Sequence, residues 1–175
     1  MNQALQELAE RIETQRSTVL NSFRTLTSEQ FNRVPAPGKW SAAEVLSHII
    51  AAERMSLAYM QKKMQGIDQV GFSGPWEEVK MLMLKISQRL PGLKFKAPRR
   101  VVENTAFFSD FASIESEWDK VRKELKGLLE QFPQHAMKRL IYKHPAAGYL
   151  NIRHALIFFR EHLHHHLPQL KKLLN

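Results

Sequence analysis

Histidine side chains interrupt two apolar stripes in this sequence. Between residues 151 and 173, apolar side chains recur at steps of three or four, and His162 and His166 occupy two positions of that stripe. His48 stands in the same way between Val45 and Ala52. A buried imidazole costs free energy unless its ring nitrogens find partners. Three such residues that face one core therefore need a common partner.

A divalent cation would satisfy the three imidazoles, because it accepts a lone pair from each. His162 and His166 are one helical turn apart, which puts their Cβ atoms about 6 Å apart on one face, as in zinc-binding H-E-x-x-H helices. We predict one divalent ion bound by His48, His162 and His166, and Zn²⁺, Ni²⁺ and Fe²⁺ all accept imidazole. Three protein ligands leave a position for water or substrate. The alternative is a set of hydrogen-bonded core histidines.

The other five histidines are expected to lie outside the metal site. His154 precedes the pair by two turns, roughly 12 Å along the helix axis, which is too far for the same ion. We expect His164 and His165 to form a solvated edge. His135 and His144 fall in predicted loops and are expected at the surface, although His144 could reach over a cavity.

Two carboxylates are candidates for a general base near the ion. Glu44 lies one turn before His48, and Glu161 directly precedes His162. Glu44 also completes an S-x-x-E capping box with Ser41, in which each side chain satisfies an amide at the start of a helix. Trp40 precedes that box, and we expect it to pack against the helix entry.

The elements that must position these residues are helices. Amphipathic patterns predict long helices over residues 3–26, 41–65, 113–132 and 151–173, and a shorter one over 75–90. Pro168 should bend the last helix without ending it. Residues 94–109 look irregular, 143–148 read as a loop, and no stretch alternates long enough to predict a sheet. The pattern indicates an all-α four-helix bundle with additional short helices, in one domain over residues 1–175.

Composition restricts the function classes. The chain has no cysteine and a net charge of +9, so thiolate ligands and a cysteine nucleophile are excluded. We expect a cytoplasmic protein, because no stretch could span a membrane and the N-terminus lacks an apolar signal core.

The basic residues are mostly dispersed and no recognition motif accompanies them, so nucleic-acid binding is not expected. The densest basic run, residues 94–100, could attract an anionic substrate.

Two segments resemble the DinB-like superfamily. Residues 37–48, PGKWSAAEVLSH, resemble its first motif, and residues 160–170, REHLHHHLPQL, resemble its second, in which H-x-x-x-H is followed by leucine and glutamine. The resemblance implies a four-helix bundle, often dimeric, with a divalent metal on three histidines that match His48, His162 and His166. It also implies metal-dependent hydrolysis, or transfer that uses a low-molecular-weight thiol. Pro168 departs from the family pattern.

Two hypotheses about function follow. The chain could be a metal-dependent enzyme that hydrolyses or transfers a small molecule, and any thiol would have to come from outside because the chain has none. Alternatively, it could be a non-catalytic stress-response protein that binds a metal or ligand. An open coordination position would favour the enzyme, and a fourth protein ligand would favour the structural role.

Overall fold

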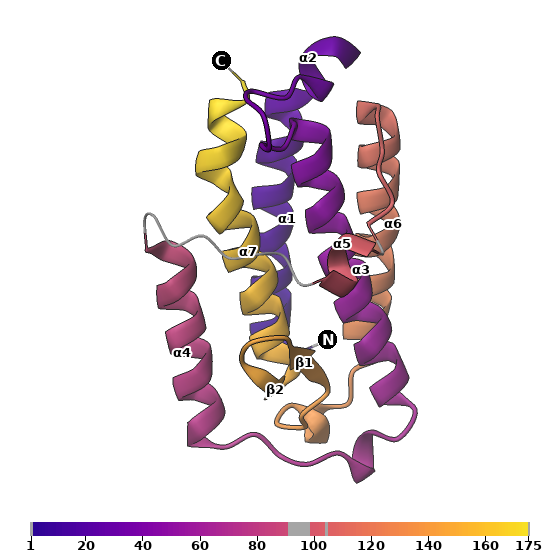
Figure 1. Cartoon of the computed structure of the whole chain (residues 1–175). Coiled ribbons are helices and arrows are strands. Elements are labelled where there is room, and N and C mark those ends of the chain that lie inside the picture. The colour runs from indigo at the N-terminus through magenta and orange to yellow at the C-terminus, as the bar shows by residue number, and fades with distance from the viewer. Residues whose placement is uncertain (1, 91–98, 104, 175) are drawn as a thin grey trace.

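Four long helices form a ring around one core (Figure 1). The structure, a computed structural model, describes residues 2–90, 99–103 and 105–174. The four helices are α1 (Gln3–Phe23), α3 (Ala42–Met64), α6 (Phe111–Glu130) and α7 (Ile152–Lys172). Helix α1 packs against α6 and α7, and α3 packs against the same two helices. The predicted four-helix bundle is therefore confirmed.

The remaining elements lie at the edges and ends of this ring. Helix α4 stands outside it, where it packs against α7 (Figure 1). The elements outside the ring are α2 (Ser28–Asn32), η1 (Ile67–Gln69), α4 (Pro75–Arg89), α5 (Arg99–Glu103), η2 (Gln134–Ala136), β1 (Tyr142–His144) and β2 (Gly148–Leu150).

A short β-hairpin corrects the expectation that the chain has no sheet. Strands β1 and β2 pair antiparallel, with Tyr142 opposite Leu150 and His144 opposite Gly148. Each strand has only three residues, too few for an alternating pattern to register in the sequence. Gly148 has a φ of +72°, a conformation that other residues rarely adopt. The hairpin leads directly into α7.

The helix boundaries follow the capping signals in the sequence. Ser41 accepts a hydrogen bond from the Glu44 amide, and Glu44 accepts one from the Ser41 amide, so the predicted capping box is confirmed. Asn151 caps α7 by accepting from the His154 amide. Helix α7 continues past Pro168, as predicted. Helix α1 ends at Phe23, three residues earlier than expected, because a turn leads into the unpredicted helix α2.

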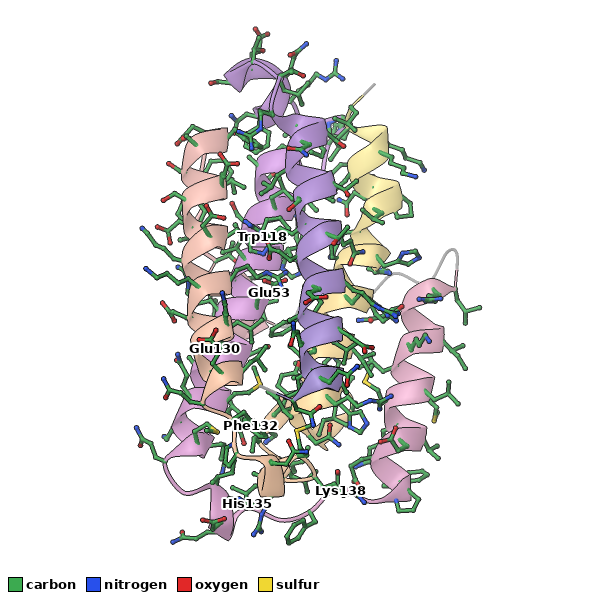
Figure 2. The ribbon with its side chains drawn as sticks, turned by 180° about the vertical axis from the view of Figure 1, so that it is seen from behind. Glu53, Trp118, Glu130, Phe132, His135 and Lys138 are labelled. Atoms are coloured by element: carbon green, nitrogen blue, oxygen red, sulfur yellow. The ribbon has the colours of Figure 1, made fainter. Side chains whose placement is uncertain are left out.

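A buried ion pair crosses the core between α3 and α6. Glu53 of α3 accepts hydrogen bonds from the Trp118 indole at 2.8 Å and from Arg122 at 2.7 Å. Figure 2 shows Glu53 and Trp118 in the interior, between the two helices. All three residues are buried. The guanidinium groups of Arg122 and Arg16 both lie within 6 Å of the Trp118 ring centroid, at 5.8 and 5.9 Å.

The sequence led to the expectations that no segment spans a membrane and that a basic run could attract an anionic substrate. None of the described helices combines the length and apolarity that crossing a membrane would require. The basic run at residues 94–100, suggested as an attractor for anionic substrates, lies outside the part of the chain whose side chains the structure describes.

Candidate metal centre

Three histidine rings meet between α3 and α7. One ring nitrogen from each of His48, His162 and His166 lies within 4.8 Å of the other two. The ring centroids are separated by 5.3 Å for His48 and His162, 5.4 Å for His48 and His166, and 4.9 Å for His162 and His166. The structure thus brings together the three residues that the stripes singled out.

Local sequence explains how each ring reaches this point. The capping box at Ser41 begins α3 so that His48 lies in its second turn, on the face toward α7. His162 and His166 share one face of α7, because a step of four residues nearly completes a turn. Helix α7 passes through Pro168 without ending, so both imidazoles project from one continuous helix.

Burial keeps the three imidazoles neutral near pH 7. It lowers the pKa of His48 and of His166 to about 4, although the hydrogen bond to Gln169 acts in the opposite direction on His166. Burial, followed by the nearby His166 and His48 rings, lowers the pKa of His162 well below its usual range. Neutral imidazoles offer the lone pairs that a metal ion requires.

The hydrogen-bonding pattern fits a metal ligand set. Nδ1 of His166 lies 3.1 Å from Oε1 of Gln169, so that nitrogen carries the proton and Nε2 keeps its lone pair. Among the described residues, none forms a hydrogen bond with Nδ1 of His48 or of His162, although both atoms are buried. Two nitrogens that each lie 2.0–2.1 Å from a tetrahedral ion are about 3.4 Å apart. Small rotations of the three rings would bring their ligand nitrogens, which lie within 4.8 Å of one another, to this spacing.

Aromatic side chains form two walls of the cluster. Trp40 lies with its ring centroid 5.1 Å from that of His48, so it lines the site as well as packing at the helix entry as expected. Phe158, one turn before His162, stacks on that ring at 5.1 Å with an interplanar angle of 15°. These rings limit the directions in which the imidazoles can turn and reduce access of water to them.

Gln169 is the orienting residue for His166, which leads to a testable expectation. Replacing it in a Gln169→Leu variant should weaken metal binding by about 10–100-fold, because the ring loses the acceptor that fixes its tautomer and direction. Competition against a chromophoric chelator would measure the change in Kd. Gln61→Leu, on an exposed position of α3, is the matched control and should leave Kd unchanged. Equal affinities in the two variants would contradict this role.

Comparison with known proteins agrees with this architecture and gives the family. The sequence profile of the DinB superfamily matches residues 11–170. The chain belongs to the DinB superfamily. No curated protein matches the sequence.

A solved structure has the same fold as this DinB chain. YfiT from Bacillus subtilis, described as a probable metal-dependent hydrolase with an unusual four-helix bundle topology, superposes with a TM-score of 0.60. The sequences are 14% identical, and the match covers 99% of this chain and 87% of YfiT. At this identity the likeness shows the shared fold.

His144 is not the surface residue that the sequence suggested. It is buried on β1, and its ring lies 4.6 Å from Phe158, the residue that stacks on His162. Its Nδ1 accepts hydrogen bonds from the amides of Ala146 and Ala147, so the neutral ring carries its proton on Nε2. The hairpin of this DinB bundle thus supports one wall of the histidine cluster.

The remaining histidines of the DinB chain lie outside the three-histidine cluster, and two of them have partners. His154 is fully buried, with Nε2 3.0 Å from Oε1 of Glu78. His164 and His135 are exposed. His165 was expected to be solvated, but it is half-buried. Its Nδ1 lies 3.0 Å from the carbonyl oxygen of Gln88 on α4.

The two carboxylates considered as general bases have structural partners. Glu161 is fully buried and bonds to Arg89 of α4 and to the neighbouring Arg160. Burial alone would raise its pKa, but the hydrogen bonds from these two guanidinium groups lower it. Glu44 bonds to the Ser41 amide at 2.8 Å. Both carboxylates thus contact scaffold groups, Glu161 the two arginines and Glu44 the start of α3.

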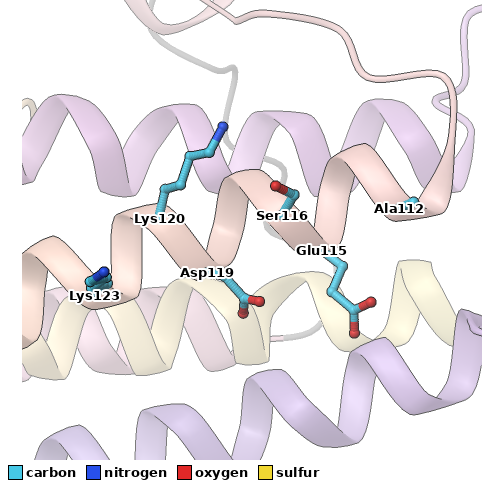
Figure 3. Close-up of a pocket in the computed structure, with 6 residues that line it drawn as sticks. All are labelled: Ala112, Glu115, Ser116, Asp119, Lys120 and Lys123. Atoms are coloured by element: carbon cyan, nitrogen blue, oxygen red, sulfur yellow. The ribbon is translucent and has the colours of Figure 1, made fainter.

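An open groove elsewhere in the bundle is not connected with the histidines. It has a volume of about 380 Å³ and follows one face of α6 (Figure 3). Both acidic residues that line it pair with arginines of α1, Glu115 with Arg24 and Asp119 with Arg16. None of the three clustered histidines lines it. We interpret it as the seam between α1 and α6.

Three residues of the site were missed in the sequence. Gln169 follows His166 by three residues and Phe158 precedes His162 by four, so helical spacing could have identified both as neighbours. His144 gave no such signal, because its place beside Phe158 depends on a hairpin that the sequence did not predict.

Proposed function

We propose that this chain is a metal-dependent hydrolase that binds one divalent ion through His48, His162 and His166. The observation that carries the proposal is the convergence of three neutral imidazoles, those of His48 and His166 buried and that of His162 half-buried, whose ligand atoms lie within 4.8 Å of one another. Zn²⁺, Ni²⁺ and Fe²⁺ are all compatible with this donor set. The description of YfiT as a probable metal-dependent hydrolase supports the same class.

When bound, the ion would act as a Lewis acid on a carbonyl or phosphoryl oxygen and lower the pKa of a coordinated water toward neutrality. The protein contributes position and exclusion of solvent. Gln169 holds the proton on Nδ1 of His166, so that Nε2 would be free to offer its lone pair to the ion. Trp40 and Phe158 shield the rings of His48 and His162. The three ligands leave a position open for water and a small-molecule substrate.

A thiol-dependent transfer is the second reaction class that such a centre could support. The ion would then stabilise a thiolate supplied by a low-molecular-weight cosubstrate, because the chain contains no cysteine. The two classes differ in whether turnover requires an added thiol.

Metal-dependent turnover is the direct test of this proposal. Purified protein loaded with Zn²⁺, Ni²⁺ or Fe²⁺ would be assayed on a panel of carboxylic esters, amides, lactones and phosphoesters, with and without glutathione. We expect hydrolysis without the thiol, lost on chelation and restored by metal. His162→Ala should abolish it, while His154→Ala, which changes a buried histidine outside the ligand group, should retain it. Turnover that survives chelation or His162→Ala, or turnover only with glutathione, would contradict the hydrolase proposal.

A further inference from the structure

His144 is a buried histidine whose second ring nitrogen has no partner among the described residues. It lies on β1, in the hairpin that leads into α7 (Figure 1), and only 8% of it is exposed. Both hydrogen bonds that the described residues make with its ring end on Nδ1, which accepts from the amides of Ala146 and Ala147 at 3.2 and 3.1 Å. A buried donor without an acceptor costs free energy, so an acceptor from outside the chain would be stabilised at Nε2.

The turn of the hairpin fixes the tautomer of this ring. Burial lowers the pKa of His144 to about 4, so the imidazole is neutral near pH 7. Its one proton lies on Nε2, because Nδ1 uses its lone pair for the two amides. The bonding directions of the two ring nitrogens diverge, so the Nε2–H bond is directed away from the turn. The ring is therefore a fixed hydrogen-bond donor.

This donor is separated from the histidine cluster by one aromatic ring. The ring centroid of His144 lies 4.6 Å from that of Phe158, which in turn lies 5.1 Å from that of His162. A small molecule with one group at the three-histidine cluster could therefore extend along Phe158 and place a second group at His144. Two anchored groups would fix the orientation of such a molecule at the centre.

We propose that His144 is a substrate-binding residue, which donates its Nε2–H to an uncharged oxygen of the substrate, a few bonds away from the group held at the metal ion. This inference rests on the proposed function, because it assigns a second part of the substrate of the same centre. The substrate class is then a small acyl compound with two oxygen-bearing groups, one that reacts and one that His144 recognises.

The surroundings of His144 favour an uncharged acceptor over a carboxylate or a phosphate. The ring is neutral, and the rings of Phe158 and Tyr142 lie 4.6 and 6.3 Å from it. Lys143, the preceding residue of β1, is directed to the exposed face of the hairpin, where its ammonium lies 5.2 Å from the Tyr149 ring. A charged group beside His144 would lose its hydration without gaining a counter-ion from these residues. A carbonyl oxygen needs only the one donor.

Two hydroxamates that differ only at the far end of the molecule test this role. Both should bind the ion of Co²⁺-loaded protein through the hydroxamate group, and the visible absorption of Co²⁺ reports their Kd without any turnover. Succinamohydroxamate ends in a carboxamide, whereas isocaprohydroxamate ends in an isopropyl group of the same shape. The ratio of the two Kd values measures the preference for an oxygen at the far end.

His144→Asn and His144→Gln separate the donor from the support of the turn. The asparagine amide can still accept from the Ala146 amide, as in an Asx turn, but it is too short to donate where Nε2 does. The glutamine amide can reach that place. We expect His144→Asn to lower the preference for succinamohydroxamate by about tenfold and His144→Gln to keep most of it. His135→Asn, at an exposed histidine of η2, is the control and should match the wild type.

The outcomes distinguish this role from the metal centre itself. An unchanged preference in His144→Asn would overturn the role, and so would an equal loss in His144→Gln. Weaker Co²⁺ binding in His144→Asn would show that the residue positions the metal ligands and does not bind substrate. If circular dichroism shows that His144→Asn is unfolded, His144→Phe, which keeps an aromatic ring against Phe158 but has no N–H, makes the same comparison. Wild-type protein that binds no Co²⁺ would overturn the proposed function, and the role of His144 with it.

Discussion

The stabilisation of the protein by metal should disappear in His162→Ala. Zn²⁺ that binds only to the native state, at a free concentration a thousand times Kd, stabilises that state by about 4 kcal/mol. For a chain of this length that raises Tm by roughly 10 °C. The three rings form a nearly equilateral triangle, in which the His162 ring centroid lies 5.3 Å from that of His48 and 4.9 Å from that of His166. Its loss leaves two imidazoles and no closed ligand set.

Thermal unfolding with and without Zn²⁺ measures this difference. The comparison is made within each variant, so any cost of the cavity left by the missing ring cancels. His154→Ala is the control, because His154 is a fully buried histidine on the same helix, α7, but lies outside the three-histidine cluster. It should keep the full metal-dependent rise in Tm. A rise of the same size in His162→Ala would show that this residue is not a ligand.

The second large effect is expected in the core, at the ion pair of Glu53 and Arg122. Replacing Arg122 by methionine should destabilise the protein by about 3–5 kcal/mol, because a carboxylate that is 1% exposed loses its counter-ion. The Trp118 indole would remain as its hydrogen-bond donor. Urea unfolding at equilibrium gives the free energy directly.

Two further variants show whether charge is the cause. Arg54→Met removes a neighbouring arginine whose pair with Glu117 is partly exposed, and it should cost less than about 1 kcal/mol. The double variant Glu53→Leu/Arg122→Met removes both charges and should recover most of the loss, because no unpaired carboxylate remains. If Arg122→Met costs no more than Arg54→Met, the pair does not stabilise the bundle in the way described.

The features that could be predicted from the sequence are those set by local periodicity and capping. His162 and His166 could be placed on one face because a helix fixes the direction of side chains four residues apart. The Ser41 capping box located the start of α3 and therefore the position of His48. The bundle itself follows from four amphipathic stripes that must bury one face each.

The features that were missed depend on contacts between distant segments. Glu161 was considered as a base because its neighbour is His162, but its partner Arg89 is 72 residues away in the sequence. His144 was expected at the surface because a three-residue strand leaves no readable pattern. The outward face of α4 has the same apolar spacing as a buried helix face. The sequence therefore did not show which face of α4 is exposed, and only the packing of the opposite face against α7 shows this.

The central claim, that three histidines hold one ion, is tested most directly by elemental analysis of purified protein. We expect about one equivalent of a divalent metal in the wild type and in His164→Ala, whose exposed side chain lies between two ligands in the sequence. His48→Ala, His162→Ala and His166→Ala should each lose the metal, because an ion held by two remaining imidazoles dissociates during purification. Stoichiometric metal in any of these three variants would contradict the three-histidine centre.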